Sequence, residues 1–313
     1  MEPFVIIADN ACDVDEPLRQ KLNIEVLPGH GVLPDGREPD LMPAFDFMDQ
    51  ETFYAEIRKK PDGFKTSPPN TQQLVNIFTR YASQGIGMLV INLSGAISGV
   101  YSFACSARKM VLEQYPDARI CCVDSLRYGP GITLLIMLAA QMRDKGVSLE
   151  ETAEFIEQHK NRIHQAGWLD DLSFVAKKGR ISNAQAFFGT LAGIKPIGET
   201  DYNGLVTVLA KVKGTKAAYG ALIGYMENTI LDAEQQDIIV AHTNRRAQAE
   251  EYKRLIEEKF HPRSVSVRDV YPATAINVGP GLMAAFYTGK PISRDLSEEK
   301  KIINRYLGLE SNV

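Results

Sequence analysis

Short apolar runs recur along the first half of the chain, and a segment with helical spacing follows each of them. We expect buried strands at four of these runs, over residues 4–8, 23–27, 87–93 and 118–123. Between and after these runs we expect a helix carrying Leu18 and Leu22, a helix that passes through Ala104 and Met110, and helices over residues 52–59, 71–82, 132–145 and 148–159. Strands that alternate with helices favour a mainly parallel sheet with helices on both faces.

Two details of this half have more than one interpretation. Asp13 and Asp15 are both candidates to cap the first helix. Residues 28–43 are rich in Pro, Gly and Asp, which predicts a loop or an irregular hairpin.

The second half, from about His164, has a different composition. We expect strands over residues 195–197, 205–212, 237–241 and 264–270, a turn at 201–204, and helices over 215–227 and 247–260. Asn277 stands just ahead of Gly279–Gly281 at what we predict to be another strand-to-helix junction, with the apolar run 282–287 beyond it. We therefore predict an α/β fold with an N-terminal domain over residues 1–163 and a C-terminal α/β domain over residues 164–313.

The composition is that of an ordinary soluble globular protein. Of 313 residues, 44% are hydrophobic and 24% are charged, and the formal net charge is -4. No basic stripe occurs, so we expect no nucleic-acid partner. The N-terminal apolar stretch is too short for a signal peptide, and the longest apolar stretch, residues 131–140, is too short to span a membrane. These features favour a cytoplasmic protein.

The cysteines and histidines follow no metal-binding or disulfide pattern. The chain has four cysteines without a CxxC motif, and we interpret them as free thiols: Cys12, Cys105, Cys121 and Cys122. The five histidines show no metal-ligand spacing, so we expect no metal.

Two segments place hydroxyl groups next to predicted helix starts. Residues 65–70, KTSPPN, set Thr66 and Ser67 ahead of two prolines that force an extended path. Their hydroxyls are candidates to bind a ligand oxygen, and equally to cap the helix at 71–82, which is the commoner use. Residues 94–101, SGAISGVY, connect a strand to a helix start, which is a place where oxyanions bind. This segment matches neither a dinucleotide fingerprint, nor a phosphate-binding loop, nor a nucleophile elbow.

One arginine stands at the edge of an apolar stretch in the second half. The segment 178–196 reads KGRISNAQAFFGTLAGIKP, in which Arg180 is followed by Ser182, Asn183 and an apolar run through Ile194. A guanidinium offers a planar fork of donors that suits a carboxylate or phosphate attached to an apolar group. A structural ion pair beside an ordinary helix core is the plainer interpretation, and the chemistry alone favours it.

Three lysines, Lys211, Lys213 and Lys216, place positive charges close together in the sequence. Solvated surface is the default interpretation of such a run. A docking face for an acidic or phosphorylated partner is the alternative.

Taken together, these motifs resemble the DegV family over nearly the whole length of the chain, in the same order. Residues 9–13 are similar to the family's opening DSTSD, residues 65–67 to its TSQP element and residues 94–101 to its SSxLSGTY element. Residues 123–125 match its IDS element, and residues 277–281 resemble its HxGPG element. Residues 178–196 are close to its GGRIS…G…IKPI segment, which is the most specific match.

The resemblance implies a protein that holds one long-chain fatty acid in a tunnel between its two domains. The residues implied to bind the carboxylate are Thr66, Ser98, Arg180 and Asn277, with Ser67, Ser94 and Gly99 in support. The fatty acid would be the sole ligand, without a cofactor, and its exchange implies transient contact with a membrane.

The resemblance also implies a partner. The family includes the fatty-acid-binding subunits of the bacterial fatty-acid kinase system, in which a separate kinase phosphorylates the carboxylate to an acyl phosphate. Lys213 falls where kinase-linked members carry an arginine, which implies a docking position for the kinase.

Two positions depart from the family pattern. Asn277 stands where the family usually has histidine, and an amide can hydrogen-bond a carboxyl group but cannot carry charge or move a proton. Lys213 keeps the positive charge but lacks the bidentate fork of arginine. Ligand binding therefore follows from the resemblance more directly than the kinase-linked role does.

We expect a binding protein without catalysis of its own, and the residues leave two alternatives open. One is a hydrolase or phosphotransferase that uses Ser98 or Thr66, and the other is a regulatory scaffold with a structural lipid. A nucleophilic serine needs a general base within hydrogen-bonding distance. His242, after the strand predicted at 237–241, is the plausible candidate, although a buried structural histidine is the plainer interpretation.

Overall fold

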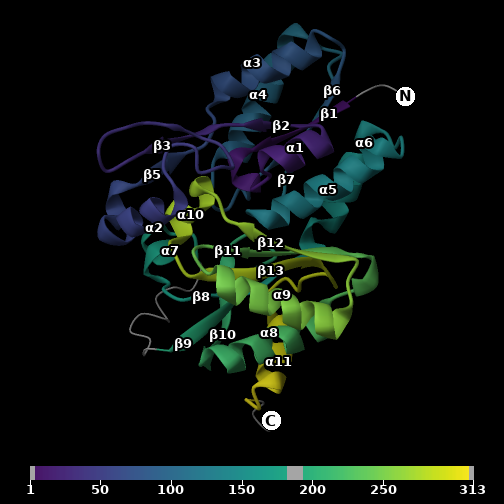
Figure 1. The fold of residues 1–313 in the computed structure, drawn as a ribbon. Helices are drawn as coiled ribbons and strands as arrows, with labels where there is room; N and C mark the ends of the chain where they lie inside the picture. The colour runs from purple at the N-terminus through teal and green to yellow at the C-terminus, as the bar shows by residue number, and fades with distance from the viewer. Residues whose placement is uncertain (1–3, 182–192, 310–313) are drawn as a thin grey trace. The chain divides into compact units, whose positions relative to one another are not determined.

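The computed structural model describes residues 4–181 and 193–309, and the chain divides into two units (Figure 1). Unit 1 contains the described residues up to Lys160 together with Tyr271–Ile276. Unit 2 contains Asn161–Val270 and the described residues from Asn277 onward. The chain therefore leaves unit 2 near its C-terminal end, contributes a short segment to unit 1 and returns.

The centre of unit 1 is a four-stranded parallel sheet. In the order β2-β1-β6-β7, its strands are Ile24–Leu27, Phe4–Asp9, Gly87–Asn92 and Ile120–Asp124. Met88 and Val90 of β6 pack with α3 (Thr71–Ala82) and α4 (Val100–Gln114). On the other face, α5 (Pro130–Asp144) and α6 (Leu149–His159) contact the same strand (Figure 1). The predicted parallel sheet between helices is confirmed, and it leaves every residue of β6 buried.

The helix starts of unit 1 decide between the alternative caps. Asp15, and not Asp13, caps α1 (Glu16–Leu22) by accepting a backbone N–H with its side chain. Asn70 caps α3 in a reciprocal capping box. Thr66 and Ser67 lie on a strand instead, so neither hydroxyl is used as the cap of α3.

A small antiparallel sheet completes unit 1. In the order β4-β3-β5, its strands are Asp40–Leu41, Gly29–Val32 and Lys65–Ser67, and α2 (Gln50–Lys59) lies between β4 and β5 in the chain. The pair β3 and β4 is the irregular hairpin predicted for residues 28–43. The Asn10 amide, just after β1, donates to the Leu41 carbonyl at 2.8 Å. Gly29 leaves room for this amide, because a Cβ there would lie 2.7 Å from Asn10 Nδ2.

Unit 2 is built on a six-stranded mixed sheet. In the order β10-β9-β8-β13-β11-β12, its strands are Val206–Lys213, Ile194–Thr200, Ile163–Leu169, Leu282–Thr288, Asp237–His242 and Ser264–Asp269. The pair β11 and β12 is parallel, and the other neighbours are antiparallel. The helices α8 (Thr215–Thr229) and α9 (Arg246–Phe260) pack on this sheet, and α11 (Ser297–Tyr306) packs against α8. The predicted α/β character of the second half is confirmed.

Two strands in the middle of this sheet differ from the sequence prediction. The predicted strand-to-helix junction at Asn277 is wrong, because the short helix α10 (Pro272–Val278) comes first and the run 282–288 is the strand β13. That run, LMAAFYT, is apolar but lacks valine and isoleucine, and its pairing with strands on both sides decides its conformation. The other strand, β8, was not predicted, because the polar residues His164 and Gln165 interrupt its apolar pattern although both are buried.

One carboxylate compensates these buried polar residues of β8. Glu199, on β9, accepts hydrogen bonds on Oε2 from the Tyr225 hydroxyl at 3.0 Å and on Oε1 from the Gln165 N–H at 2.8 Å. Its Oε2 also lies 2.9 Å from His164 Nδ1, and His164 Nε2 lies 2.8 Å from the Lys290 carbonyl. Both side chains of the His164–Glu199 pair are fully buried, so the pair ties β8 to β9 inside the core.

Glu199→Gln is expected to lower the free energy of unfolding by about 2–5 kcal/mol, because an amide nitrogen cannot accept and leaves buried donors around Glu199 without their acceptor. Chemical denaturation followed by circular dichroism measures the change. Glu234→Gln, at an exposed glutamate of the same unit, is the control and should cost less than about 0.5 kcal/mol. A cost for Glu199→Gln no larger than that of the control would contradict the role of the pair.

Candidate ligand-binding site

The turn that follows β6 is held by carboxylates from the two neighbouring strands. Asp9, at the end of β1, accepts the Leu93 N–H on Oδ2 at 2.8 Å. Asp124, at the end of β7, accepts the Gly95 N–H on Oδ1 at 3.0 Å. The carboxyl ends of parallel strands share one edge of the sheet, where α/β folds bind their ligands. The backbone on both sides of Ser94 is therefore fixed at this edge.

Ser94 is buried and forms the base of the turn. Its N–H donates to the Arg127 carbonyl at 3.0 Å, and its carbonyl accepts the Ser98 N–H at 3.1 Å. The Ser98 oxygen Oγ in turn accepts the Val100 N–H at 3.3 Å, and Gly99 is the N-cap residue of α4. Ser94, Ser98 and Gly99 thus lie together at the junction between β6 and α4.

The Ser98 hydroxyl is half-buried and acts as an acceptor. Its oxygen accepts from the Val100 backbone, and within residues 4–181 and 193–309 no hydrogen bond donated by this hydroxyl is found. A hydroxyl that accepts from an N–H becomes a better donor, and the N-terminal end of the 15-residue helix α4 favours an anion. The arrangement can bind an oxyanion such as a carboxylate.

Both carboxylate oxygens of Asp9 accept backbone N–H groups at this edge of the sheet. It is 2% exposed, with Oδ1 accepting the Ala11 N–H at 3.0 Å and Oδ2 also accepting from Asn92 Nδ2 at 3.3 Å. Burial raises the pKa of Asp9, although the hydrogen bonds from Leu93 and Ala11 oppose the rise. Asp9 therefore acts as a structural acceptor.

Thr66 and Ser67, the other predicted hydroxyl groups of unit 1, lie on β5. Thr66 pairs with Gly31 of β3 and is half-buried, whereas Ser67 pairs with His30 and is exposed. Neither serves as a helix cap, so both hydroxyls stand on an extended backbone. Thr66 and Ser98 belong to the same unit.

Arg180 belongs to unit 2 and follows α7 (Ser173–Lys177) closely. It is half-buried, its guanidinium donates to the Lys178 carbonyl, and its N–H donates to the Val175 carbonyl at 3.2 Å. Among the residues that the structure describes, Arg180 makes no ion pair. Ser182, Asn183 and the apolar residues up to Ala192 lie outside the described residues, and the segment 182–192 contains no Asp or Glu.

Asn277 is half-buried near the end of α10, just ahead of the Gly279–Gly281 turn. Gly279 has φ of +74°, and a Cβ there would lie 2.4 Å from the Phe174 ring. Because Phe174 belongs to α7, the turn after Asn277 packs against the segment that leads to Arg180. Unit 2 thus brings together the segments that carry its two predicted site residues.

A charged cluster at the end of β8 is absent from the sequence prediction. Asp170 accepts hydrogen bonds from Lys195 and from Arg245, the latter at 2.6 Å, and lies against Gly281, where a Cβ would come within 2.8 Å of it. Burial by itself would raise the pKa of Asp170, but the two cations outweigh burial and lower it. No local motif signals this cluster, since the partners are 25 and 75 residues away.

Lys211, Lys213 and Lys216 are exposed in unit 2, from the end of β10 to the start of α8. This exposure agrees with the interpretation of the three lysines as solvated surface.

The candidate base His242 is 2% exposed, with Nδ1 3.6 Å from Asp269 Oδ1, and burial lowers its pKa. In the described part of the chain, no histidine is hydrogen-bonded to Ser98. The geometry therefore gives Ser98 no activating base among these contacts.

Three general features bound the chemistry of the described residues. The four cysteines are free thiols. No group of three or more His, Cys, Asp or Glu side chains within residues 4–181 and 193–309 is placed to hold a metal ion. None of the helices described is both long and apolar enough to cross a membrane.

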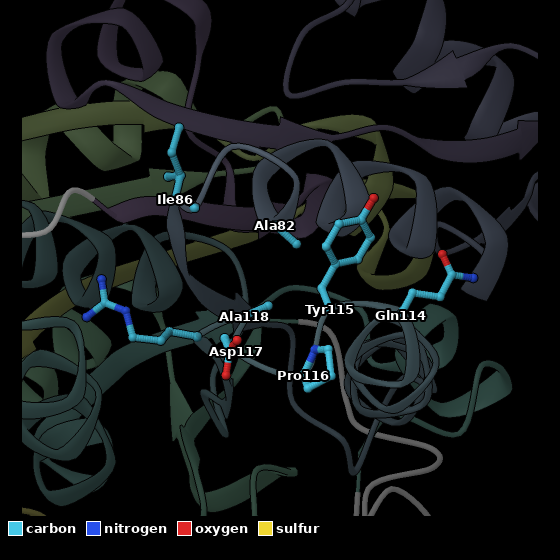
Figure 2. A pocket seen from close by; sticks show the side chains of 9 residues that line it. Ala82, Ile86, Gln114, Tyr115, Pro116, Asp117 and Ala118 are labelled. Atoms are coloured by element: carbon cyan, nitrogen blue, oxygen red, sulfur yellow. The ribbon is translucent and has the colours of Figure 1, made fainter.

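A pocket of about 330 Å³ lies in unit 1, at the ends of α3 and α4 and the starts of β6 and β7. Figure 2 shows the side chains that line it. Its lining includes Tyr115, Asp117 and Arg119, and Arg119 lies 3.7 Å from Glu150. The pocket is at the amino ends of the parallel strands, so the length of β6 separates it from Ser98. It contains none of the predicted site residues.

Known sequences match the chain over both units. A model of the DegV family, described as uncharacterised proteins, matches residues 3–290. A DegV domain-containing protein of Clostridium perfringens is 31% identical over 292 residues, covering 92% of this chain and 98% of the relative. A second relative, from Lactococcus lactis, is 32% identical over 241 residues, covering 76% of this chain and 82% of the relative.

Solved structures share the fold. A DegV lipid-binding protein of Thermotoga maritima matches with a TM-score of 0.80 and 23% identity, covering 93% of this chain and 100% of the other. A DegV family protein of Thermus thermophilus, described by its fatty-acid binding, gives 0.81 and 20%, with coverage of 91% and 99%. DegV of Bacillus subtilis, described as a fatty acid binding protein, gives 0.77 and 22%, with coverage of 93% and 100%. At these identities the similarity establishes the α/β fold.

Asp170→Asn is expected to lower the free energy of unfolding at pH 7 by about 1–3 kcal/mol, because the amide no longer compensates two cations. The folded pKa of Asp170 lies below its ordinary value of 3.8, so this stabilisation is complete above the unfolded pKa and is lost as pH falls through the folded pKa. Urea denaturation of both proteins between about pH 2 and pH 7 measures the difference, which should shrink below about pH 4. A difference that stays constant with pH would contradict the assignment, and Asp232→Asn, at an exposed aspartate, is the control.

Proposed function

The chain belongs to the DegV family, and from that premise we propose that it binds one long-chain fatty acid and catalyses no reaction of its own. The ligand class is supported by the proteins of the same fold from Thermotoga maritima, Thermus thermophilus and Bacillus subtilis, which are described as binding lipid or fatty acid. The described residues support the acidic end of such a ligand, because the junction between β6 and α4 can bind an oxyanion.

The observation that carries the proposal is the Ser98 hydroxyl at the start of α4, which is polarised by the Val100 N–H and donates to no acceptor among the described residues. A carboxylate removed from water needs donors or a cation to compensate its charge. Thr66 offers a second hydroxyl from the same unit. Ser67, Ser94 and Gly99 would support these two positions.

Two residues of unit 2 complete the proposed carboxylate set. Arg180 offers a guanidinium without a carboxylate partner among the described residues, which suits it to an anionic ligand. Asn277 offers an amide, a neutral group that can donate to a carboxylate. Their part in binding is a proposal that the variants below test.

The acyl tail would supply most of the affinity. Each buried CH₂ group contributes about 0.8 kcal/mol, so a long chain outweighs any single polar contact. An apolar tunnel for the tail and transient contact with a membrane during exchange are parts of the same proposal.

The alternative of a hydrolase or phosphotransferase has less support. The contact found at the Ser98 hydroxyl is a backbone N–H, whereas a nucleophile needs a base within hydrogen-bonding reach. A scaffold with a structural lipid would use the same residues and would differ by releasing its ligand slowly.

We further propose that the bound carboxylate is presented to a separate kinase for acyl-phosphate formation, with Lys213 in the docking surface. The exposed Lys213 offers a charge for an acidic partner. Lys213→Glu should slow acyl-phosphate formation by a partner kinase by about tenfold or more without changing fatty-acid affinity. An unchanged rate would remove Lys213 from the docking surface.

Arg180→Ala is expected to weaken fatty-acid binding by about tenfold to a hundredfold, since it removes a charge-assisted contact. Ser98→Ala should weaken binding by about threefold to tenfold, as expected for one neutral hydrogen bond. Titration of delipidated protein with palmitic acid, followed by isothermal calorimetry, measures both constants.

Two matched variants control this titration. Arg58→Ala removes an exposed arginine that, like Arg180, donates to a nearby backbone carbonyl, and Ser102→Ala removes an exposed serine one turn along α4. Both should bind as the unchanged protein does. If Arg180→Ala kept full affinity and instead lowered the melting temperature sharply, Arg180 would be a structural residue.

A further inference from the structure

We propose that Asp124 is a positioning residue for the Ser98 hydroxyl, an inference that rests on the function proposed above. Asp124 does not bind the fatty acid itself. Its side chain holds the peptide group between Ser94 and Gly95, and the carbonyl of that group accepts the Ser98 N–H. Asp124 therefore determines where the Ser98 hydroxyl points.

The contacts of Asp124 join three segments of unit 1. Its Oδ1 accepts the Gly95 N–H and the Leu126 N–H, each at 3.0 Å. Its backbone carbonyl accepts from Lys160 Nζ at 2.9 Å. The carboxylate therefore links the turn after β6 to the turn after β7, while the main chain at Asp124 is held from the end of α6.

The Gly95 N–H and the Ser94 carbonyl belong to one planar peptide group. Asp124 holds this group by its N–H, and the same group holds Ser98, because the Ser94 carbonyl accepts the Ser98 N–H at 3.1 Å. Rotation of the peptide plane would break both hydrogen bonds together. The Asp124 contact is thus coupled to the position of Ser98 through rigid covalent geometry.

The contact also requires glycine at position 95. A Cβ on Gly95 would lie 2.7 Å from Asp124 Oδ2, so any side chain there would push the carboxylate away. Gly95 has no positive φ, so the backbone conformation itself does not demand glycine. The close approach of Asp124 is the physical reason for the small residue.

An acceptor, and not a charge, is what this position needs. A negative charge near a bound carboxylate would oppose binding, so loss of the Asp124 charge should not weaken the ligand. Asp124→Asn keeps an oxygen that can accept the Gly95 N–H, whereas Asp124→Ala leaves that N–H without its acceptor. The two variants therefore separate positioning from electrostatics.

The test measures palmitic acid affinity and hydrogen exchange over residues 93–99 in delipidated full-length protein. Asp124→Ala should weaken binding by about tenfold and accelerate exchange of the Gly95 and Ser98 amides. Asp124→Asn should keep affinity within about threefold and keep the slow exchange. Asp117→Ala, at an exposed aspartate on the opposite edge of the sheet, is the control and should change neither.

Several outcomes would overturn the proposal. Full affinity in Asp124→Ala would do so, as would an Asp124→Asn variant that binds as weakly as Asp124→Ala. If Asp124→Ala does not fold, Gly95→Ala takes its place, and unchanged exchange and affinity in that variant would overturn the proposal equally. If the unchanged protein binds no fatty acid, the proposed function fails, and the exchange data alone then decide whether Asp124 holds the turn.

Discussion

The candidate site of unit 1 depends on one peptide group, between Ser94 and Gly95. Its N–H is fixed by Asp124 and its carbonyl fixes the Ser98 backbone, while Asp9 holds the residue before Ser94. Two acidic side chains thus stand beside a place suited to an anion. Both oxygens of Asp9 and Oδ1 of Asp124 accept backbone N–H groups. Among the described residues the Ser98 hydroxyl donates to no acceptor, so its hydrogen can point to an anion.

In unit 2, too, charged groups are engaged within the fold. Lys195 and Arg245 are both paired with Asp170, so these two cations are used in the fold. Arg180 contacts a backbone carbonyl and has no carboxylate partner among the described residues. A cation without a carboxylate partner in the described part of the chain is a group that an anionic ligand can use.

The sequence predicted the elements whose pattern is local. The buried run of β6, the helices that follow the strands and the turn at Asp201–Gly204 are visible in short windows, and the structure contains them. The predictions failed where distant residues decide the outcome. The polar residues of β8 hide a buried strand, because His164 is compensated by Glu199 from another strand. The apolar run of β13 suggests a helix, and only its pairing with β8 and β11 makes it a strand.

In the candidate site, too, the residues with a local pattern were predicted and those that depend on distant contacts were not. Ser98 and its flanking small residues are recognisable from a strand followed by a helix start. Asp124 and Asp170 were not singled out as site residues, because their roles come from contacts with Gly95 and Arg245 that lie 29 and 75 residues away. A carboxylate that accepts a backbone N–H from a distant segment, as Asp124 does, follows no spacing rule in the sequence, in contrast to a local helix cap such as Asp15.

Native mass spectrometry of the protein as purified, before any delipidation, tests the central claim most directly. We predict one long-chain fatty acid bound to each chain, removed by delipidation and restored by added palmitic or oleic acid. A protein that carries no acyl chain and takes up neither acid would contradict the account.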